Sequence, residues 1–171
     1  MKTCYLHLGM PKTGSTSIQN AFFEFRDGDI RYAELGQPNH GLPLVSAFSA
    51  KPENYYVNRN RGVGPAAARK MGAAYREEIS RIAESDGDVI FSTEVIPDHM
   101  TPEDIEGMIA FFQARAEAVK VIFYARPVAS LVSSQFQQNI KFGGSVFKLP
   151  APKYRKRFET VVNAVGRENV T

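Results

Sequence analysis

The residues most capable of chemistry lie in a loop near the start of the chain, which reads Gly9-Met10-Pro11-Lys12-Thr13-Gly14-Ser15-Thr16-Ser17. The loop follows an apolar strand and leads into an amphipathic helix, so its backbone N–H groups and the positive end of the helix dipole can cradle an anion. Gly9 and Gly14 have the spacing of a Walker-type phosphate-binding loop. Ser15, however, stands where that motif has its lysine, and the cation is Lys12. This argues against an ordinary ATPase or GTPase. The alternative is a simple strand-to-helix turn in which Ser15 or Thr16 caps the helix.

A second candidate site lies in the last third of the chain. Residues 120–125 form a continuous apolar run typical of a buried parallel strand, and Arg126 follows directly. The pattern of 128–140 predicts a helix, which carries Ser134 eight residues after the arginine. The guanidinium fork of Arg126 suits a phosphate, and Ser134 can donate a further hydrogen bond to the same group. Taken alone, such an arginine would more often be a surface ion-pair partner.

Two residues are candidates for a general base. Glu94 comes just after the apolar strand 88–92 and is our first candidate, because the carboxyl ends of parallel strands share one ligand-binding edge. The alternatives for Glu94 are a Walker-B-like carboxylate or a structural ion pair with a basic loop residue. His40 is the competing base or an acceptor-binding group, since histidine titrates near neutrality. Its alternative is a solvated turn residue beside Asn39 and Gly41.

The elements that must position these residues alternate between strand and helix. Strand signals at 3–8, 88–92 and 120–125 are separated by helical patterns, one carrying Ile18, Phe22 and Phe25 and another spanning 66–84. Thr101 and Pro102 introduce a further helix as N-cap and first-turn proline. This order predicts an α/β fold of three layers, with a central parallel sheet flanked by helices, in a single domain over 1–171.

Two Gly- and Pro-rich segments interrupt this pattern. We expect 27–65 to be a long loop, either a lid, a binding loop or a disordered segment, and 143–152 to be a second loop. The acceptor cleft is predicted between them.

The two candidate sites together resemble the cofactor signatures of the sulfotransferases that use 3′-phosphoadenosine 5′-phosphosulfate, and the resemblance covers nearly the whole chain. It implies a P-loop-containing nucleotide-binding fold. It also implies that the 5′-phosphosulfate is bound by the first loop, through Pro11, Lys12, Thr13, Gly14, Ser15, Thr16 and Ser17. Arg126 and Ser134 would hold the 3′-phosphate that distinguishes this nucleotide from ATP. The continuation Ser17-Ile18-Gln19 is closer to bacterial and carbohydrate-type members than to cytosolic small-molecule enzymes.

The activity implied is transfer of a sulfuryl group to a hydroxyl or amine of an unidentified acceptor. We expect it to need no metal, because a sulfuryl group carries less negative charge than a phosphoryl group, and Lys12 with fixed amides and hydroxyls could stabilise the leaving phosphate. Two alternatives remain: a P-loop kinase using magnesium-ATP, and a noncatalytic nucleotide- or sulfated-glycan-binding module. Members of the family normally continue beyond this point, so we expect the C-terminal part of the fold to be missing.

Composition narrows the class further. The chain has 171 residues, a net charge of +3 and 43% hydrophobic residues, which is ordinary for a globular protein and too weakly basic for a typical nucleic-acid binder. One cysteine, Cys4, and three widely spaced histidines predict no metal site. No signal sequence or spanning segment is evident, so we expect a cytoplasmic protein that does not bind membranes.

Overall fold

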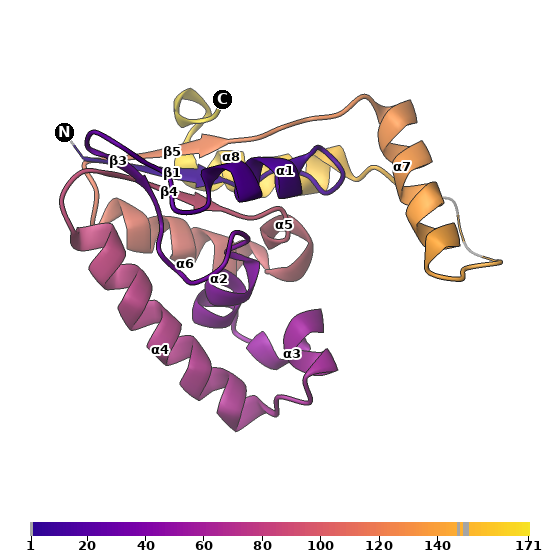
Figure 1. Cartoon of the computed structure of the whole chain (residues 1–171), viewed down its shortest axis with the longest axis horizontal. Helices are drawn as coiled ribbons and strands as arrows, with labels where there is room; N and C mark the ends of the chain where they lie inside the picture. The colour runs from indigo at the N-terminus through magenta and orange to yellow at the C-terminus, as the bar shows by residue number, and fades with distance from the viewer. Residues whose placement is uncertain (1, 147, 149–150) are drawn as a thin grey trace.

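The computed structural model describes residues 2–146, 148 and 151–171. Within them the chain has an α/β fold, a five-stranded and mostly parallel sheet packed against helices (Figure 1). The strands, in sheet order, are β2 (Arg26–Asp27), β3 (Ile30–Tyr32), β4 (Asp88–Ser92), β1 (Thr3–His7) and β5 (Ala118–Ile122). Only β2, which forms a hairpin with β3, is antiparallel to its neighbour.

The helices connect these strands and cover the sheet. They are α1 (Ser15–Phe22), α2 (Gly41–Phe48), α3 (Tyr56–Asn60), α4 (Pro65–Glu84), α5 (Ile96–His99), α6 (Pro102–Gln113), α7 (Val128–Lys141) and α8 (Tyr154–Val165), with 3₁₀ turns η1 (Pro52–Asn54) and η2 (Arg167–Asn169). Of the described helices, none combines the length and apolarity needed to cross a membrane. In Figure 1, α7 stands at one end of the molecule, apart from the helices packed on the sheet.

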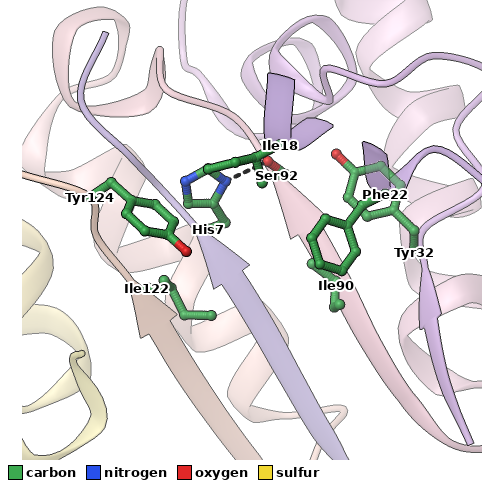
Figure 2. Close-up of a pocket in the computed structure, with 8 residues that line it drawn as sticks. All are labelled: His7, Ile18, Phe22, Tyr32, Ile90, Ser92, Ile122 and Tyr124. Atoms are coloured by element: carbon green, nitrogen blue, oxygen red, sulfur yellow. Dashed lines mark hydrogen bonds between the residues drawn. The ribbon is translucent and has the colours of Figure 1, made fainter. Parts of the chain in front are cut away.

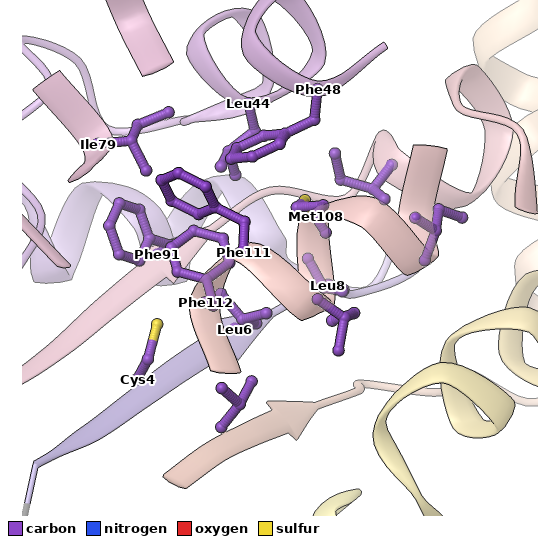
Figure 3. Close-up of a cluster of buried hydrophobic side chains, with 14 of the residues drawn as sticks. Cys4, Leu6, Leu8, Leu44, Phe48, Ile79, Phe91, Met108, Phe111 and Phe112 are labelled. Carbon is purple, nitrogen blue, oxygen red and sulfur yellow. The ribbon is translucent and has the colours of Figure 1, made fainter. Parts of the chain in front are cut away.

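The two faces of the sheet are covered unequally, because successive side chains of a strand point to opposite faces. On one face, Ile18 and Phe22 of α1 lie over His7, Ile90 and Ser92 (Figure 2). The other face holds the hydrophobic core. There the side chains of Leu6 and Phe91 pack against buried residues of α2, α4 and α6, among them Leu44, Ile79, Met108 and Phe112 (Figure 3). The same cluster includes Val121 of β5 and Val161 of α8. Cys4 is also buried in it, and burial raises the pKa of its thiol.

The predicted start of α6 is confirmed. Thr101 is the N-cap, its side chain accepts a hydrogen bond from Asp104 N, and the Asp104 carboxylate accepts one from Thr101 N in return. This capping box satisfies two N–H groups that the first turn of a helix leaves without partners.

The prediction of a long loop over 27–65 is wrong. Gly28 adopts a left-handed conformation, with φ 55, in the turn that connects β2 to β3. In β3, Tyr32 then pairs with Ile90 of β4. The apolar run of α2 forms a buried helix that packs along α4, with Ser46 O so close to Gly72 that a Cβ there would lie 2.1 Å from it. The glycines and prolines therefore mark turns and close contacts between ordered elements.

The predicted end of the first helix also differs from the observed one. The first helix ends at Phe22, and Phe25 lies in a turn beyond it, where its N–H donates to Phe22 O. The second predicted loop contains residues 147, 149 and 150, which lie outside the described part of the chain.

Candidate functional site

The loop between β1 and α1 has the backbone shape of an anion cradle. Lys12 and Gly14 both adopt left-handed conformations, with φ 69 and φ 87, and the Thr13 hydroxyl donates to Met10 O at 2.6 Å. Gly14 is the N-cap of α1 and no side chain caps the helix, so the interpretation of Ser15 or Thr16 as caps is wrong. The first N–H groups of a helix have no intrahelical partner, and here they belong to residues that line a pocket.

Arg126 connects this loop to α7. Its Nη1 donates to Lys12 O at 2.7 Å, and its Nε donates to Ser130 Oγ at 3.0 Å. Ser130 in turn donates to Pro127 O, which fixes the hydroxyl at the start of α7. Arg126 therefore hydrogen-bonds a carbonyl and a hydroxyl, and a left-handed Lys12 backbone, unusual for a residue with a side chain, is held in place by this contact.

A polar pocket of about 410 Å³ lies between the loop and α7. It brings together residues more than a hundred positions apart in the sequence, and its lining consists of Pro11, Lys12, Gly14, Ser15, Thr16, Glu94, Arg126, Ser134 and Gln138. Two predicted residues of the loop do not line it: the Thr13 hydroxyl is bonded within the loop, and Ser17 is exposed on α1. The pocket carries two cationic groups and one carboxylate.

Glu94 reaches this pocket from the carboxyl end of β4. Its Oε2 accepts a hydrogen bond from Gln19 at 2.8 Å and another from Asn39 at 3.2 Å. Among the described residues these partners are amides, and no basic side chain forms an ion pair with Glu94. Oε1 accepts no hydrogen bond from the described residues, so it is the oxygen able to take a proton from a bound molecule.

His40 is placed differently from the prediction. It is fully buried, it precedes α2, and its Nδ1 accepts a hydrogen bond from Ser92 N at 3.1 Å. Burial lowers the pKa of His40 to about 4, although the carbonyls of Ala33 and Gln37 act in the opposite direction. The interpretation as a solvated turn residue is wrong, and His40 does not line the polar pocket.

A smaller pocket of about 90 Å³ lies on the α1 face of the sheet. Figure 2 shows the His7 ring between Tyr124 and Ser92, and Nδ1 of His7 lies 2.7 Å from Ser92 Oγ. Burial lowers the pKa of His7, while the Glu94 carboxylate raises it. A Cβ on Gly9 would lie 2.8 Å from His7 Nε2, so a glycine here lets the loop leave β1 over the ring. The lining is mainly apolar, and the polar pocket is therefore the better candidate for an anionic ligand.

The sequence interpretation missed four polar residues of the site. Gln19 and Asn39 hold the Glu94 carboxylate, and nothing in the linear pattern indicates these contacts because they join distant segments. Ser130 and Gln138 had a readable signal. Together with Arg126 and Ser134 they form a series with a spacing of four residues. This spacing places Ser130, Ser134 and Gln138 along one side of α7.

Among the described residues, no group of three or more His, Cys, Asp and Glu side chains could hold a metal ion. No protein-family model matches the chain, and no curated protein matches its sequence. The site is therefore interpreted from its own geometry and chemistry.

Proposed function

We propose that the chain binds 3′-phosphoadenosine 5′-phosphosulfate in the polar pocket and transfers its sulfuryl group to a hydroxyl or amine acceptor. The observation that carries this proposal is that a single pocket is lined by both Lys12 and the Arg126–Ser134 pair, with Glu94 beside them. The candidate phosphate loop lies between β1 and α1. This position supports a fold of the P-loop nucleotide-binding type, with helices on both sides of the sheet.

Each group in the pocket has a chemical task in this proposal. The N–H groups at the start of α1, the hydroxyls of Ser15 and Thr16, and Lys12 would hold the 5′-phosphosulfate. A guanidinium has five N–H donors, of which Arg126 uses one on Nε and one on Nη1, so three remain for a 3′-phosphate. Ser134 would add a hydroxyl donor from α7.

In the transfer step, sulfur exchanges one bond for another and Glu94 takes up one proton. The acceptor oxygen or nitrogen forms a bond to sulfur while the bond from sulfur to the 5′-phosphate oxygen breaks. Oε1 of Glu94 takes the acceptor's proton, and Lys12 stabilises the negative charge that develops on the leaving phosphate. Gln19 and Asn39 keep Glu94 oriented through Oε2.

One observation favours a kinase as the second candidate. Glu94 follows β4, the strand beside β1, and lies near the phosphate loop, where a carboxylate could assist a magnesium ion bound to ATP. Against it, Ser15 occupies the position at which a Walker-type loop has its lysine.

Calorimetric titration of the chain with 3′-phosphoadenosine 5′-phosphate, ADP and magnesium-ATP at one salt concentration tests the proposal. We expect the 3′-phosphorylated nucleotide to bind at least about tenfold more tightly than ADP without metal, since one charge-assisted hydrogen bond contributes about 1.5–3 kcal/mol. Preference for magnesium-ATP would support the kinase instead.

Glu94→Gln tests the assignment of the base. The substitution keeps the shape of the side chain and should abolish turnover while the nucleotide still binds; unchanged turnover would rule out Glu94 as the base.

A further inference from the structure

His7 is the last residue of β1, and its imidazole ring lies against the start of the phosphate loop. A Cβ on Gly9 would lie 2.8 Å from Nε2 of His7, so no side chain can separate the ring from the loop backbone at this position. The backbone of His7 is fixed in the sheet, where its carbonyl accepts a hydrogen bond from Thr93 N at 2.9 Å. The residue is 4% exposed. The ring is therefore held between the sheet and the loop.

A chain of hydrogen bonds assigns the hydrogen of this ring. The Tyr32 hydroxyl donates to Pro38 O, so the Tyr32 oxygen can only accept a hydrogen bond from the Ser92 hydroxyl. Burial raises the pKa of Tyr32 to about 12, and the hydrogen bond from Ser92 acts in the opposite direction, as a donor to this oxygen does. Ser92 has then used its only hydroxyl proton, and its Oγ accepts from His7 Nδ1 at 2.7 Å. Nδ1 therefore carries the hydrogen, and Nε2 carries a lone pair.

This lone pair on Nε2 of His7 is buried and has no hydrogen-bond partner among the described residues, which is unusual for a buried polar atom. In Figure 2 the dashed line joins one ring nitrogen to Ser92, and the other nitrogen lies away from Ser92. Tyr124 packs edge-to-face on the ring, with the centroids 5.3 Å apart. Nε2 can therefore take up a proton without breaking a hydrogen bond to any described residue.

The surroundings of the ring keep it neutral when the loop binds no anion. Burial lowers the pKa of His7 below its usual value, and the Glu94 carboxylate acts in the opposite direction. The other titratable side chains around the ring and Ser92 are the phenols of Tyr32 and Tyr124 and the imidazole of His40. Burial lowers the pKa of His40 to about 4, so this second imidazole carries no charge at pH 7. Glu94 is thus the charged group that favours a proton on His7.

An anion in the phosphate loop changes this balance. The polar pocket contains the cationic side chains of Lys12 and Arg126 and the carboxylate of Glu94. The nucleotide 3′-phosphoadenosine 5′-phosphate brings two phosphate groups, each with a charge of about −1.5 to −2 at neutral pH. Its binding would reverse the net charge of the pocket. Negative charge beside a neutral imidazole favours the protonated form.

We infer that His7 couples nucleotide binding to proton uptake: its Nε2 gains one proton from solvent when a nucleotide phosphate binds in the loop. Nδ1 keeps its hydrogen bond to Ser92, and the imidazolium places a positive charge beside the bound anion. The affinity of the site therefore increases as the pH falls. This inference rests on the proposed function, because it assigns the nucleotide to the loop, and it adds a proton-linked residue that does not line the polar pocket.

Calorimetric titration of the full chain at pH 6 and pH 8 tests the inference. The probes are 3′-phosphoadenosine 5′-phosphate and inorganic pyrophosphate, which has no nucleoside and reports on the loop alone. Between pH 8 and pH 6 we expect the affinity of the natural chain for each probe to rise about three- to tenfold relative to that of His7→Gln. The comparison with the variant removes the contribution of the probe's own phosphates. His99→Gln is the matched control, because burial also lowers the pKa of His99 but this residue lines a different pocket, and it should keep the pH dependence of the natural chain.

Nuclear magnetic resonance of the ring nitrogens tests the natural chain directly. The chain has three histidines, so their ¹⁵N resonances can be assigned by substituting each in turn. We expect His7 to carry its hydrogen on Nδ1 in the ligand-free chain at pH 7, and to shift toward imidazolium when either probe is added at pH 6.

Two results would overturn the inference alone: a hydrogen on Nε2 in the ligand-free chain, or the same pH dependence of affinity in the natural chain and His7→Gln. Proton-linked binding of pyrophosphate without a preference for the 3′-phosphorylated nucleotide over ADP would count against the proposed function and leave the role of His7 in place. Binding of neither anion would overturn both.

Discussion

Replacement of Arg126 by alanine should weaken binding of 3′-phosphoadenosine 5′-phosphate more than binding of ADP. The side chain has two tasks in the structure: Nη1 and Nε hold the loop and α7 through Lys12 O and Ser130 Oγ, and its remaining donors point to a 3′-phosphate in our proposal. ADP can lose only the first contribution. The 3′-phosphorylated nucleotide would lose both.

The two contributions differ in size. A hydrogen bond to a charged phosphate is worth about 1.5–3 kcal/mol, and the loop hydrogen bonds, between a guanidinium and neutral acceptors in a half-buried position, contribute about 0.5–1.5 kcal/mol. We therefore expect Arg126→Ala to weaken ADP binding by about threefold to tenfold. Binding of the 3′-phosphorylated nucleotide should weaken by a further factor of about 10 to 150.

Calorimetric titration of both nucleotides at one fixed ionic strength measures this difference directly, because salt screens the phosphate contacts. Ser130→Ala is the matched control: it removes the partner of Nε and leaves the donors assigned to the phosphate in place. It should weaken both nucleotides equally and slightly. If Arg126→Ala also weakens both by the same factor, then Arg126 is a structural residue of the loop and the assignment of the 3′-phosphate is refuted.

Three further predictions concern catalysis, packing and pH. Lys12→Ala should lower kcat about a hundredfold with a smaller effect on product-nucleotide affinity, because the lysine acts mainly on the leaving group; a loss of affinity alone in single-turnover and titration measurements would contradict this. Gly72→Ala places a Cβ 2.1 Å from Ser46 O and should lower the free energy of unfolding, because overpacking costs about 1–3 kcal/mol and outweighs the gain of about 1 kcal/mol in helix propensity. In urea titrations Gly107→Ala, with nothing within 4 Å, should be neutral or stabilising, and equal behaviour of the two would refute the contact. Burial lowers the pKa of His40 from 6.5 to about 4, so its stabilising contribution is complete above pH 6.5 and declines as the pH falls toward 4. Between pH 7 and 4.5 the natural chain should lose about 2–3 kcal/mol more stability than His40→Gln, and parallel pH profiles in urea unfolding would disprove it.

Local sequence patterns were sufficient to predict several of the strands and helices. Residues 88–92 form a strand as predicted, because an apolar run of this length fits a buried parallel strand. The Thr101 cap and the helix after Arg126 were also predictable, since each depends on residues within a few positions of one another. The α/β class followed from the alternation of these elements.

Other features depend on contacts that no short pattern contains. The segment 27–65 has many glycines and prolines, yet it forms β3 and α2, because pairing with β4 and burial against α4 outweigh its local preference for loops. His40 has the local sequence of an exposed turn, yet it is buried. Its ring packs near Tyr32 and Phe91, and its Nδ1 accepts a hydrogen bond from the backbone N–H of Ser92 in β4.

The same division holds for the candidate site. The types and spacing of Lys12, Arg126 and Ser134 were enough to predict an anion-binding loop and a phosphate-binding pair, since those tasks depend on local backbone and side-chain chemistry. Only the tertiary structure brings them into one pocket with Glu94, joins Arg126 to Lys12 O, and holds the Glu94 carboxylate with Gln19 and Asn39. These contacts arise because parallel strands from distant parts of the chain end at one edge of the sheet, and the order of strands in the sheet is set by packing of the whole core.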